Sequence, residues 1–314
     1  MKPFAFERAR NVDHALSLAA AAPGARFLAG GTNLLDLMKL EIEQPDTLID
    51  VGRLPLADIS ETAGGGLRIG ALATNTFVAS DPRVRSRYPV LARAILSGAS
   101  VQLRNKASMG GNLMQRTRCT YFMDPAKPCN KRLPGSGCSA MGGLSQATAL
   151  FGASEFCAAV SASDMSVALA VLDAEVETVR ADGSVRRRPV ETLHRLPGDA
   201  PQVDTDLAPD ELILAVELPP PPSGSQVWRK VRARASYIGA LASIAVAGDR
   251  VALGAVAARP WRARATEAAL AGGAAPREAA EAELVSASGQ DGRKSLVRRL
   301  ATDAIQESLK GGRS

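Results

Sequence analysis

The sequence has 314 residues, of which 46% are hydrophobic and 22% are charged, and its net charge is +6. This length and apolar content exclude a disordered or fibrous chain and allow about two domains. The basic residues are scattered, and no predicted helix or strand carries the face of aromatic and basic side chains that binding would need, so we expect no nucleic-acid partner. No apolar run approaches the roughly 18 residues that a membrane span requires, so we expect no such span.

The first 60 residues are predicted to form a strand–helix–strand unit. Residues 26–29 are an extended apolar run, residues 33–40 carry apolar side chains at helical spacing, and residues 47–51 are rich in β-formers. Before the first predicted strand of this unit, an Ala/Leu-rich stretch interrupted by Asp13 and His14 predicts an amphipathic helix rather than a signal peptide.

A glycine-containing turn joins the first strand to the helix of this unit. The segment RFLAGGTNL, residues 26–34, would let several backbone N–H groups converge on an anion such as a pyrophosphate. A tight turn that needs glycine only for its dihedral angles explains the same residues. The segment lacks the G-x-G-x-x-G spacing of a Rossmann fold.

Residues 61–222 have a mixed pattern, and four prolines at 219–222 form the best linker in the sequence. Beyond the linker, residues 223–314 are expected to form a small α+β domain with a three-stranded antiparallel sheet. The predicted elements are a strand at 67–72, a helix at 88–96, an irregular stretch at 116–157, a helix at 165–172, a hairpin at 174–188 turning at Asp182-Gly183, strands at 211–218, 227–234, 240–247 and 250–257, and helices within 262–309.

A second glycine loop, SMGGNL at residues 108–113, repeats the chemistry of the first. Gly110 and Gly111 permit close backbone approach, and Ser108 and Asn112 supply side-chain hydrogen bonds. Two such loops indicate a ligand of dinucleotide size.

The sequence resembles the FAD-binding subunits of the xanthine dehydrogenase and molybdenum hydroxylase family over nearly its whole length. The resemblance is carried by AGGTN, GGN, the pair Ser163-Asp164, and Lys230 in WRKVR. It implies a mixed α+β fold, with a PCMH-type FAD-binding domain at residues 1–222, in two parts of about 1–60 and 61–222, and a C-terminal domain at 223–314.

The resemblance also implies which residues contact FAD. The first loop would wrap the pyrophosphate, the second would contact the ribityl and phosphate region, Asp164 would hold the adenosine, Lys230 would lie near the flavin ring, and Ile213 would make an apolar contact. From the residues alone, Asp164 fits a helix N-cap equally well, and Lys230 fits a solvated strand position. The full expected set is Arg26, Phe27, Leu28, Ala29, Gly30, Gly31, Thr32, Asn33, Leu34, Ser108, Gly110, Gly111, Asn112, Asp164, Ile213 and Lys230.

The four cysteines of the chain lie in one 39-residue window: Cys119, Cys129, Cys138 and Cys157. Disulfides are not needed by a chain with an ample core. Structural zinc usually shows close cysteine pairs, whereas four isolated thiolates fit an iron–sulfur cubane, although spacing alone leaves zinc open. The resemblance to a subset typified by bacterial periplasmic aldehyde oxidoreductases, which carry an insertion like that at 116–157, implies a [4Fe–4S] cluster.

Basic residues surround the first cysteines. Each by itself is expected to belong to a solvated loop, but as a group they would offset the charge of an anionic cluster and offer a surface to a partner. They are Arg116, Arg118, Lys127, Lys131 and Arg132.

No catalytic constellation is visible, since neither His14 nor His194 lies near an acid and a nucleophile in the sequence. A flavin performs its own redox chemistry, so this chain needs no catalytic residue. The resemblance implies an electron-transfer subunit of a heterotrimeric molybdenum-dependent aldehyde oxidoreductase, which oxidises aldehydes to carboxylic acids. Electrons would pass from a molybdenum cofactor on a large partner, through [2Fe–2S] clusters on a small partner, to FAD and then to an external acceptor.

Three other functions remain open at this stage. They are a subunit of a purine hydroxylase of the xanthine dehydrogenase type, a stand-alone FAD oxidoreductase, and a zinc-stabilised nucleotide-binding module. We expect the chain to fold in the cytoplasm, and its export to the periplasm would depend on a signal-bearing partner subunit.

Overall fold

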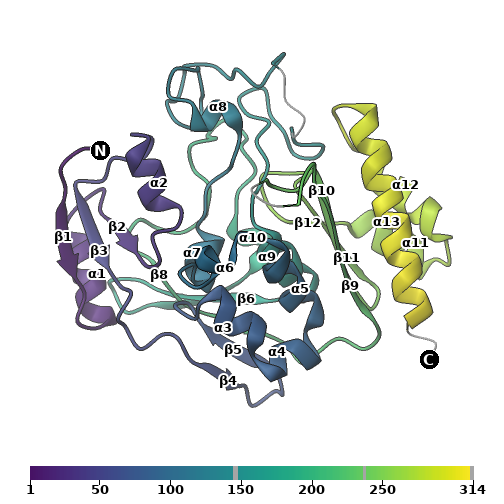
Figure 1. Ribbon diagram of the computed structural model, residues 1–314, viewed down its shortest axis with the longest axis horizontal. Helices are drawn as coiled ribbons and strands as arrows, with labels where there is room; N and C mark the ends of the chain where they lie inside the picture. The colour runs from purple at the N-terminus through teal and green to yellow at the C-terminus, as the bar shows by residue number, and fades with distance from the viewer. Residues whose placement is uncertain (144–147, 236–237, 312–314) are drawn as a thin grey trace.

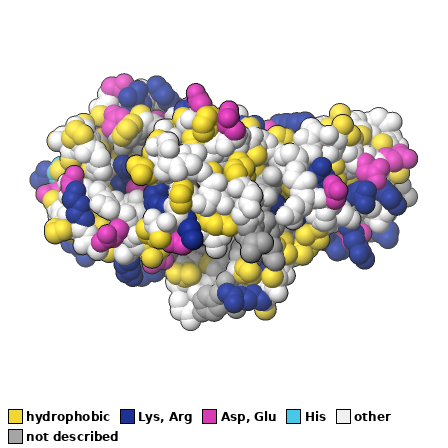
Figure 2. All heavy atoms as spheres, turned by 90° about the horizontal axis from the view of Figure 1, so that it is seen from above, with side chains coloured by type: hydrophobic (Ala, Val, Ile, Leu, Met, Phe, Trp, Pro, Cys, Tyr) yellow, Lys and Arg dark blue, Asp and Glu magenta, His cyan; other side chains and the backbone are white. Residues whose placement is uncertain are grey.

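The computed structural model describes residues 1–143, 148–235 and 238–311, which form three β-sheets surrounded by helices (Figure 1). The mixed α+β class predicted from the sequence is confirmed. Within these described ranges, no helix combines the length and apolarity needed to cross a membrane. On the face shown in Figure 2, Lys and Arg side chains are interspersed with Asp and Glu.

The first sheet is parallel, with strand order β1 (Ala5–Arg8), β3 (Thr47–Asp50), β2 (Arg26–Leu28). Parallel neighbours need crossover connections, and helices α1 (Val12–Ala21) and α2 (Leu34–Lys39) supply them. The predicted strand–helix–strand unit is therefore confirmed. Strand β1 was not predicted, because its four residues are all exposed and show no alternation.

The second sheet has five antiparallel strands in the order β4-β5-β8-β6-β7. It contains the predicted hairpin as β6 and β7 and the predicted strands β5 and β8. The strands are β4 (Ile59–Glu61), β5 (Leu67–Gly70), β6 (Glu175–Val179), β7 (Val185–Pro189) and β8 (Leu212–Leu218), and the accompanying helices are α3 (Asn75–Ser80), α4 (Pro82–Arg87), α5 (Pro89–Ser97), α6 (Val101–Arg104), α7 (Met109–Leu113), α9 (Asp164–Val171) and α10 (Val190–Leu193).

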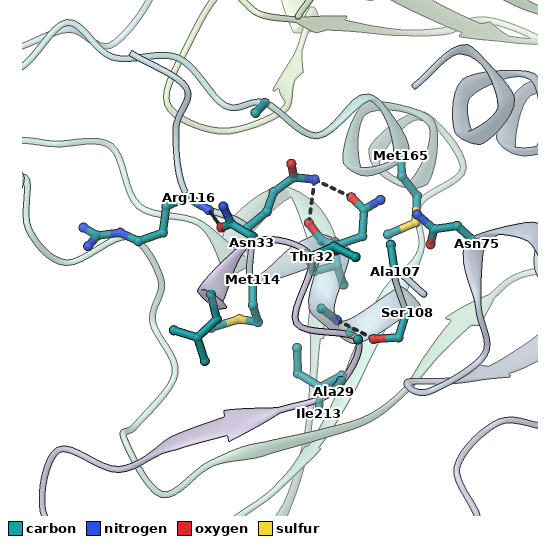
Figure 3. A pocket seen from close by; sticks show the side chains of 18 of the residues that line it. Ala29, Thr32, Asn33, Asn75, Ala107, Ser108, Met114, Arg116, Met165 and Ile213 are labelled. Atoms are coloured by element: carbon teal, nitrogen blue, oxygen red, sulfur yellow. Dashed lines mark hydrogen bonds between the residues drawn. The ribbon is translucent and has the colours of Figure 1, made fainter. Parts of the chain in front are cut away.

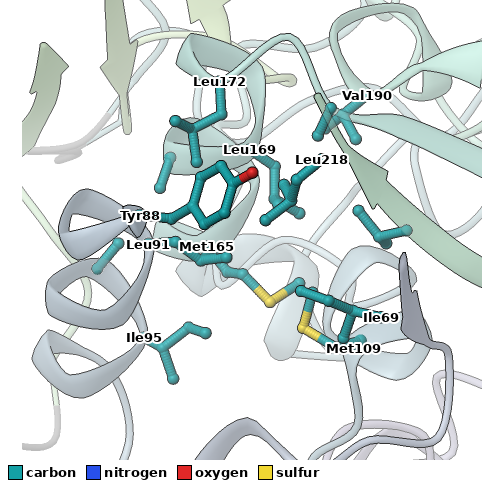
Figure 4. Packing of buried hydrophobic residues seen from close by; sticks show 14 of the residues in the cluster. Ile69, Tyr88, Leu91, Ile95, Met109, Met165, Leu169, Leu172, Val190 and Leu218 are labelled. Carbon is teal, nitrogen blue, oxygen red and sulfur yellow. The ribbon is translucent and has the colours of Figure 1, made fainter. Parts of the chain in front are cut away.

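Helix α9 is the centre of the main core. Its residues from Met165 to Val171 are all buried, because it packs against α5 as well as against the third sheet. Figure 4 shows Met165 and Leu169 among side chains from α5 and β8. The Tyr88 hydroxyl donates to the Pro219 carbonyl at 2.6 Å, so the buried ring leaves no unsatisfied group.

The third sheet is antiparallel, with order β12-β11-β10-β9. Alternate side chains of β10 enter two cores: Ala245 packs with α9, whereas Ile244 and Val246 pack with α13. Three strands were expected, and the fourth, β12, is only two residues long, too short for a sequence pattern. The elements are β9 (Gln226–Val231), β10 (Ala242–Ala247), β11 (Arg250–Gly254), β12 (Trp261–Arg262), α11 (Arg264–Ala271), α12 (Pro276–Leu284) and α13 (Asp291–Gly311).

The cysteine-containing segment, residues 116–157, projects as irregular loops with one short helix, α8 (Thr120–Met123), in its described part (Figure 1). It rests on α2, where Leu37 forms a small apolar cluster with Phe122 and Cys129. The division of the chain at residue 222 stays a prediction.

Candidate functional site

A cavity of about 1040 Å³ lies between the first and second sheets and the start of α9, and all sixteen residues of the expected ligand-contact set line it. These residues come from five separate parts of the chain: the β2–α2 turn, α7, the first residue of α9, β8 and β9. Cavities that enclose small ligands measure roughly 300–1,000 Å³, so this one has room for a dinucleotide. Figure 3 shows Thr32, Ser108 and Ile213 on its walls.

The two glycine-containing segments are pressed against each other. A Cβ atom placed on Gly30 would lie 1.8 Å from the carbonyl oxygen of Lys106, just before the second segment. The next residue, Gly31, has φ +72°, a left-handed conformation that other residues adopt only with strain. Both glycines are therefore required by the fold of the cavity wall itself.

The second segment is helical, which corrects the expectation of a loop. Ser108 caps α7 by accepting a hydrogen bond from the Gly111 N–H at 3.2 Å. The side-chain oxygen of Asn112 accepts hydrogen bonds from Gln115 and from the Ser163 hydroxyl, both at 2.7 Å. These contacts fix the Asn112 amide in one orientation at the cavity wall.

Asp164 and Lys230 form an ion pair of 2.5 Å, and their side chains are only 12% and 7% exposed. Burial raises the pKa of Asp164, and the Lys230 ammonium opposes that rise. The expected N-cap of α9 is wrong by one residue, because Ser163 accepts the Ser166 N–H at 3.0 Å. The solvated position considered for Lys230 is also wrong.

The ion pair bears on the roles that the resemblance implies for these two residues. Asp164 was expected at the adenosine and Lys230 near the flavin ring, and the structure brings the two side chains into direct contact. Their separate roles toward FAD stay predictions.

Three polar atoms of cavity-lining residues are buried and have no hydrogen-bond partner among the described residues: Asn33 Nδ2, Asn75 Oδ1 and His194 Nδ1. Leaving a buried donor or acceptor unsatisfied costs about 1–3 kcal/mol. A ligand that carries both donors and acceptors, as a flavin dinucleotide does, fits such a wall. Asn75 and His194 had no sequence signal, since neither belongs to one of the motifs that indicated a ligand.

His194 is buried in the wall of the cavity. Its Nε2 lies 2.7 Å from the Leu113 carbonyl oxygen, and a carbonyl only accepts, so Nε2 carries the hydrogen. Burial lowers the pKa of His194. The ring is therefore neutral at pH 7, with Nδ1 as an acceptor.

We expect His194 to make the protein less stable in mild acid. Because its pKa is lower in the folded state, the unfolded chain binds the proton first, and stability falls as the pH drops below about 6.5. His194 should contribute a slope of at most about 1.4 kcal/mol per pH unit to the dependence of the unfolding free energy on pH. Urea unfolding of wild type and His194→Gln between pH 8 and 5.5 measures it, with His14→Gln as the matched control. Equal slopes for wild type and His194→Gln would contradict the assignment.

The four cysteines are free thiols, and in the described residues they form no disulfide. Burial raises the pKa of the Cys119 and Cys157 thiols, and the charges of Cys129 and Cys138 raise both further. Cys119 and Cys157 therefore each lie near Cys129 and Cys138, and the backbones of Cys129 and Cys138 pair in an isolated antiparallel bridge. Within the ranges that the structure describes, no three His, Cys, Asp or Glu side chains are arranged to hold a metal ion, so the expected metal site is not seen preformed.

The basic residues near the cysteines are not simply a solvated group. The Arg116 and Lys131 side chains are 17% and 4% exposed and pair with carboxylates. Arg132 donates to the carbonyls of Tyr121 and Phe122 at 3.0 and 2.7 Å, which holds the loop together. For these residues the solvated-loop expectation is wrong.

Comparison with known proteins identifies the family. The profile of the FAD-binding domain in molybdopterin dehydrogenase matches residues 2–221. The chain belongs to the FAD-binding subunits of the molybdenum hydroxylases. This membership confirms the resemblance found in the sequence and accounts for the large cavity.

One curated relative agrees with the assignment, and two solved structures share the fold. The chain is 54% identical over 279 residues to the aldehyde oxidoreductase FAD-binding subunit of Escherichia coli (strain K12), covering 87% of this chain and 88% of that one. Its fold matches a carbon monoxide dehydrogenase chain from Hydrogenophaga pseudoflava, with TM-score 0.75, 23% identity and 98% coverage of both chains. It also matches a chain of quinoline 2-oxidoreductase from Pseudomonas putida 86, with TM-score 0.73, 23% identity and 100% coverage of both.

Proposed function

We propose that this chain is the FAD-binding, electron-carrying subunit of a heterotrimeric molybdenum-dependent aldehyde oxidoreductase that converts aldehydes to carboxylic acids. The observation that carries the proposal is the single cavity that collects all sixteen expected FAD contacts. The 54% identity to an aldehyde oxidoreductase subunit supports aldehydes over purines as the substrate class. A large molybdenum-cofactor subunit, a small [2Fe–2S] subunit and an external acceptor complete the proposed system.

The residues of the cavity would bind and orient the flavin nucleotide. Bound FAD would supply the redox chemistry of electron transfer. Gly30 and Gly31 would let backbone N–H groups approach the diphosphate, and the Asp164–Lys230 pair would offer a charged contact. Apolar lining residues such as Ile213 would exclude water from the ring system.

We also propose that Cys119, Cys129, Cys138 and Cys157 bind a [4Fe–4S] cluster. Four free thiols within electrostatic reach repel one another once deprotonated, and bound iron relieves that repulsion. A cubane is held at its corners by four separate thiolates, which spreads its ligands more widely than a single zinc ion does.

The proposal is tested by purifying the chain with its partner subunits and recording the visible spectrum together with metal and flavin analysis. We expect flavin bands over a broad iron–sulfur shoulder, with about four irons per FAD beyond those of the small subunit. Flavin without the additional iron would remove the cluster. Zinc without flavin would leave only a nucleotide-binding module.

A further inference from the structure

One buried network connects the cysteine segment to the cavity. The Arg116 guanidinium donates to Glu43 at 2.5 Å and to Asp204 at 2.7 Å, and Lys131 reaches the other oxygen of Asp204 at 2.5 Å. Lys131 also donates to the Pro201 carbonyl at 2.6 Å. Asp204 is therefore shared between a residue that precedes the first cysteine and one that follows the second.

The same arginine contacts the first glycine segment through its backbone. The Arg116 N–H donates to Asn33 Oδ1 at 2.9 Å (Figure 3), and this bond sets the direction of the otherwise unpartnered Nδ2 of Asn33. The guanidinium also lies over the Phe122 ring, 4.7 Å from its centroid. Any shift of Arg116 thus moves the cavity wall and the cysteine segment together.

Apolar packing provides a second connection. Leu37, one turn into α2, contacts Phe122 and Cys129 in a cluster in which these three residues are at most 7% exposed. Helix α2 begins at Leu34, the last residue of the first glycine segment. The positions of Cys129 and of the glycine segment are therefore linked through α2 as well as through Arg116.

From these contacts we infer that the Arg116–Asp204–Lys131 network is a positioning device that makes FAD binding depend on the metal-bound state of the cysteine segment. With the cluster bound, the segment holds Lys131 and Arg116 on Asp204, and Arg116 holds Asn33 at the cavity. Without it, the segment loses its fixed geometry and the Asn33 contact loosens. This inference rests on the proposed function and adds a dependence between its two cofactors.

The experiment is a double-mutant cycle in the complex purified with its partner subunits, with the FAD dissociation constant and the iron content as readouts. Cys129→Ser removes a cluster ligand, and Asp204→Asn removes the carboxylate that Arg116 and Lys131 share. Each single variant should weaken FAD binding by about 5- to 150-fold, the usual range for coupling between sites. The double variant should bind FAD no more weakly than Cys129→Ser alone, because both changes break the same connection.

Additive effects in the double variant, or unchanged FAD affinity in Cys129→Ser, would overturn the inference while leaving the two cofactor sites intact. Absence of FAD from the wild-type complex would instead overturn the proposed function. Asp206→Asn is the matched control, since that carboxylate is 68% exposed and should change neither readout. Arg116→Lys keeps the charge but loses the two-pronged contact, and it repeats the test if Asp204→Asn does not fold.

Discussion

Gly30→Ala is expected to weaken FAD binding by about tenfold to 100-fold. The added methyl group would lie 1.8 Å from the Lys106 carbonyl oxygen and 2.6 Å from its carbon, and both are backbone atoms that no side-chain rotation can move. The two glycine-containing segments must then separate, and overpacking of this kind costs about 1–3 kcal/mol, which corresponds to that loss of affinity. Titration of the apoprotein with FAD, followed by flavin fluorescence, measures the effect.

The matched control is Gly64→Ala, in which the methyl group meets nothing within 4 Å and the glycine has no positive φ. This variant should keep the wild-type FAD affinity. Circular dichroism of both variants separates a loss of flavin from a loss of fold. Wild-type FAD affinity in a folded Gly30→Ala protein would show that the close approach of the two segments does not shape the flavin site.

The sequence predicted well those features that depend on neighbouring residues. The β2–α2–β3 unit and the β6–β7 hairpin follow from apolar periodicity and turn residues, which act over a few positions. The sixteen cavity residues came from motifs that the resemblance aligned, and each motif is itself a short stretch. Periodicity, turn residues and short motifs thus identified the secondary structure and the cavity-lining segments, but they did not show which of these segments contact each other.

Contacts between distant residues could not be predicted in this way. The Asp164–Lys230 pair spans 66 positions and the Arg116–Asp204 pair spans 88. An aspartate in a loop carries no mark of a partner that far away, so Asp204 was missed, and the direct contact between Asp164 and Lys230 was not predicted. Helix α7 was missed for a different reason, because two of its five residues are glycines, which disfavour helices.

The largest effect on metal content is expected for Cys129→Ser, which should remove the cluster iron of this subunit. Cys129 is 7% exposed, and the residues around it are fixed by the Arg132 and Leu133 N–H bonds to its carbonyl at 3.0 and 2.8 Å. A serine hydroxyl is a poor substitute for a soft thiolate ligand, and no other cysteine is available to replace it. Iron analysis per complex and the visible spectrum of the purified complex measure the loss.

Leu133→Ser is the control for Cys129→Ser, because Leu133 lies in the same loop but is 64% exposed, so its replacement should leave the iron content unchanged. Full iron content in Cys129→Ser would place the cluster elsewhere in the complex. Zinc in the wild type that disappears in Cys129→Ser would instead make the four cysteines a structural zinc site. Because zinc has no redox chemistry, that result would confine electron transfer in this chain to the flavin alone.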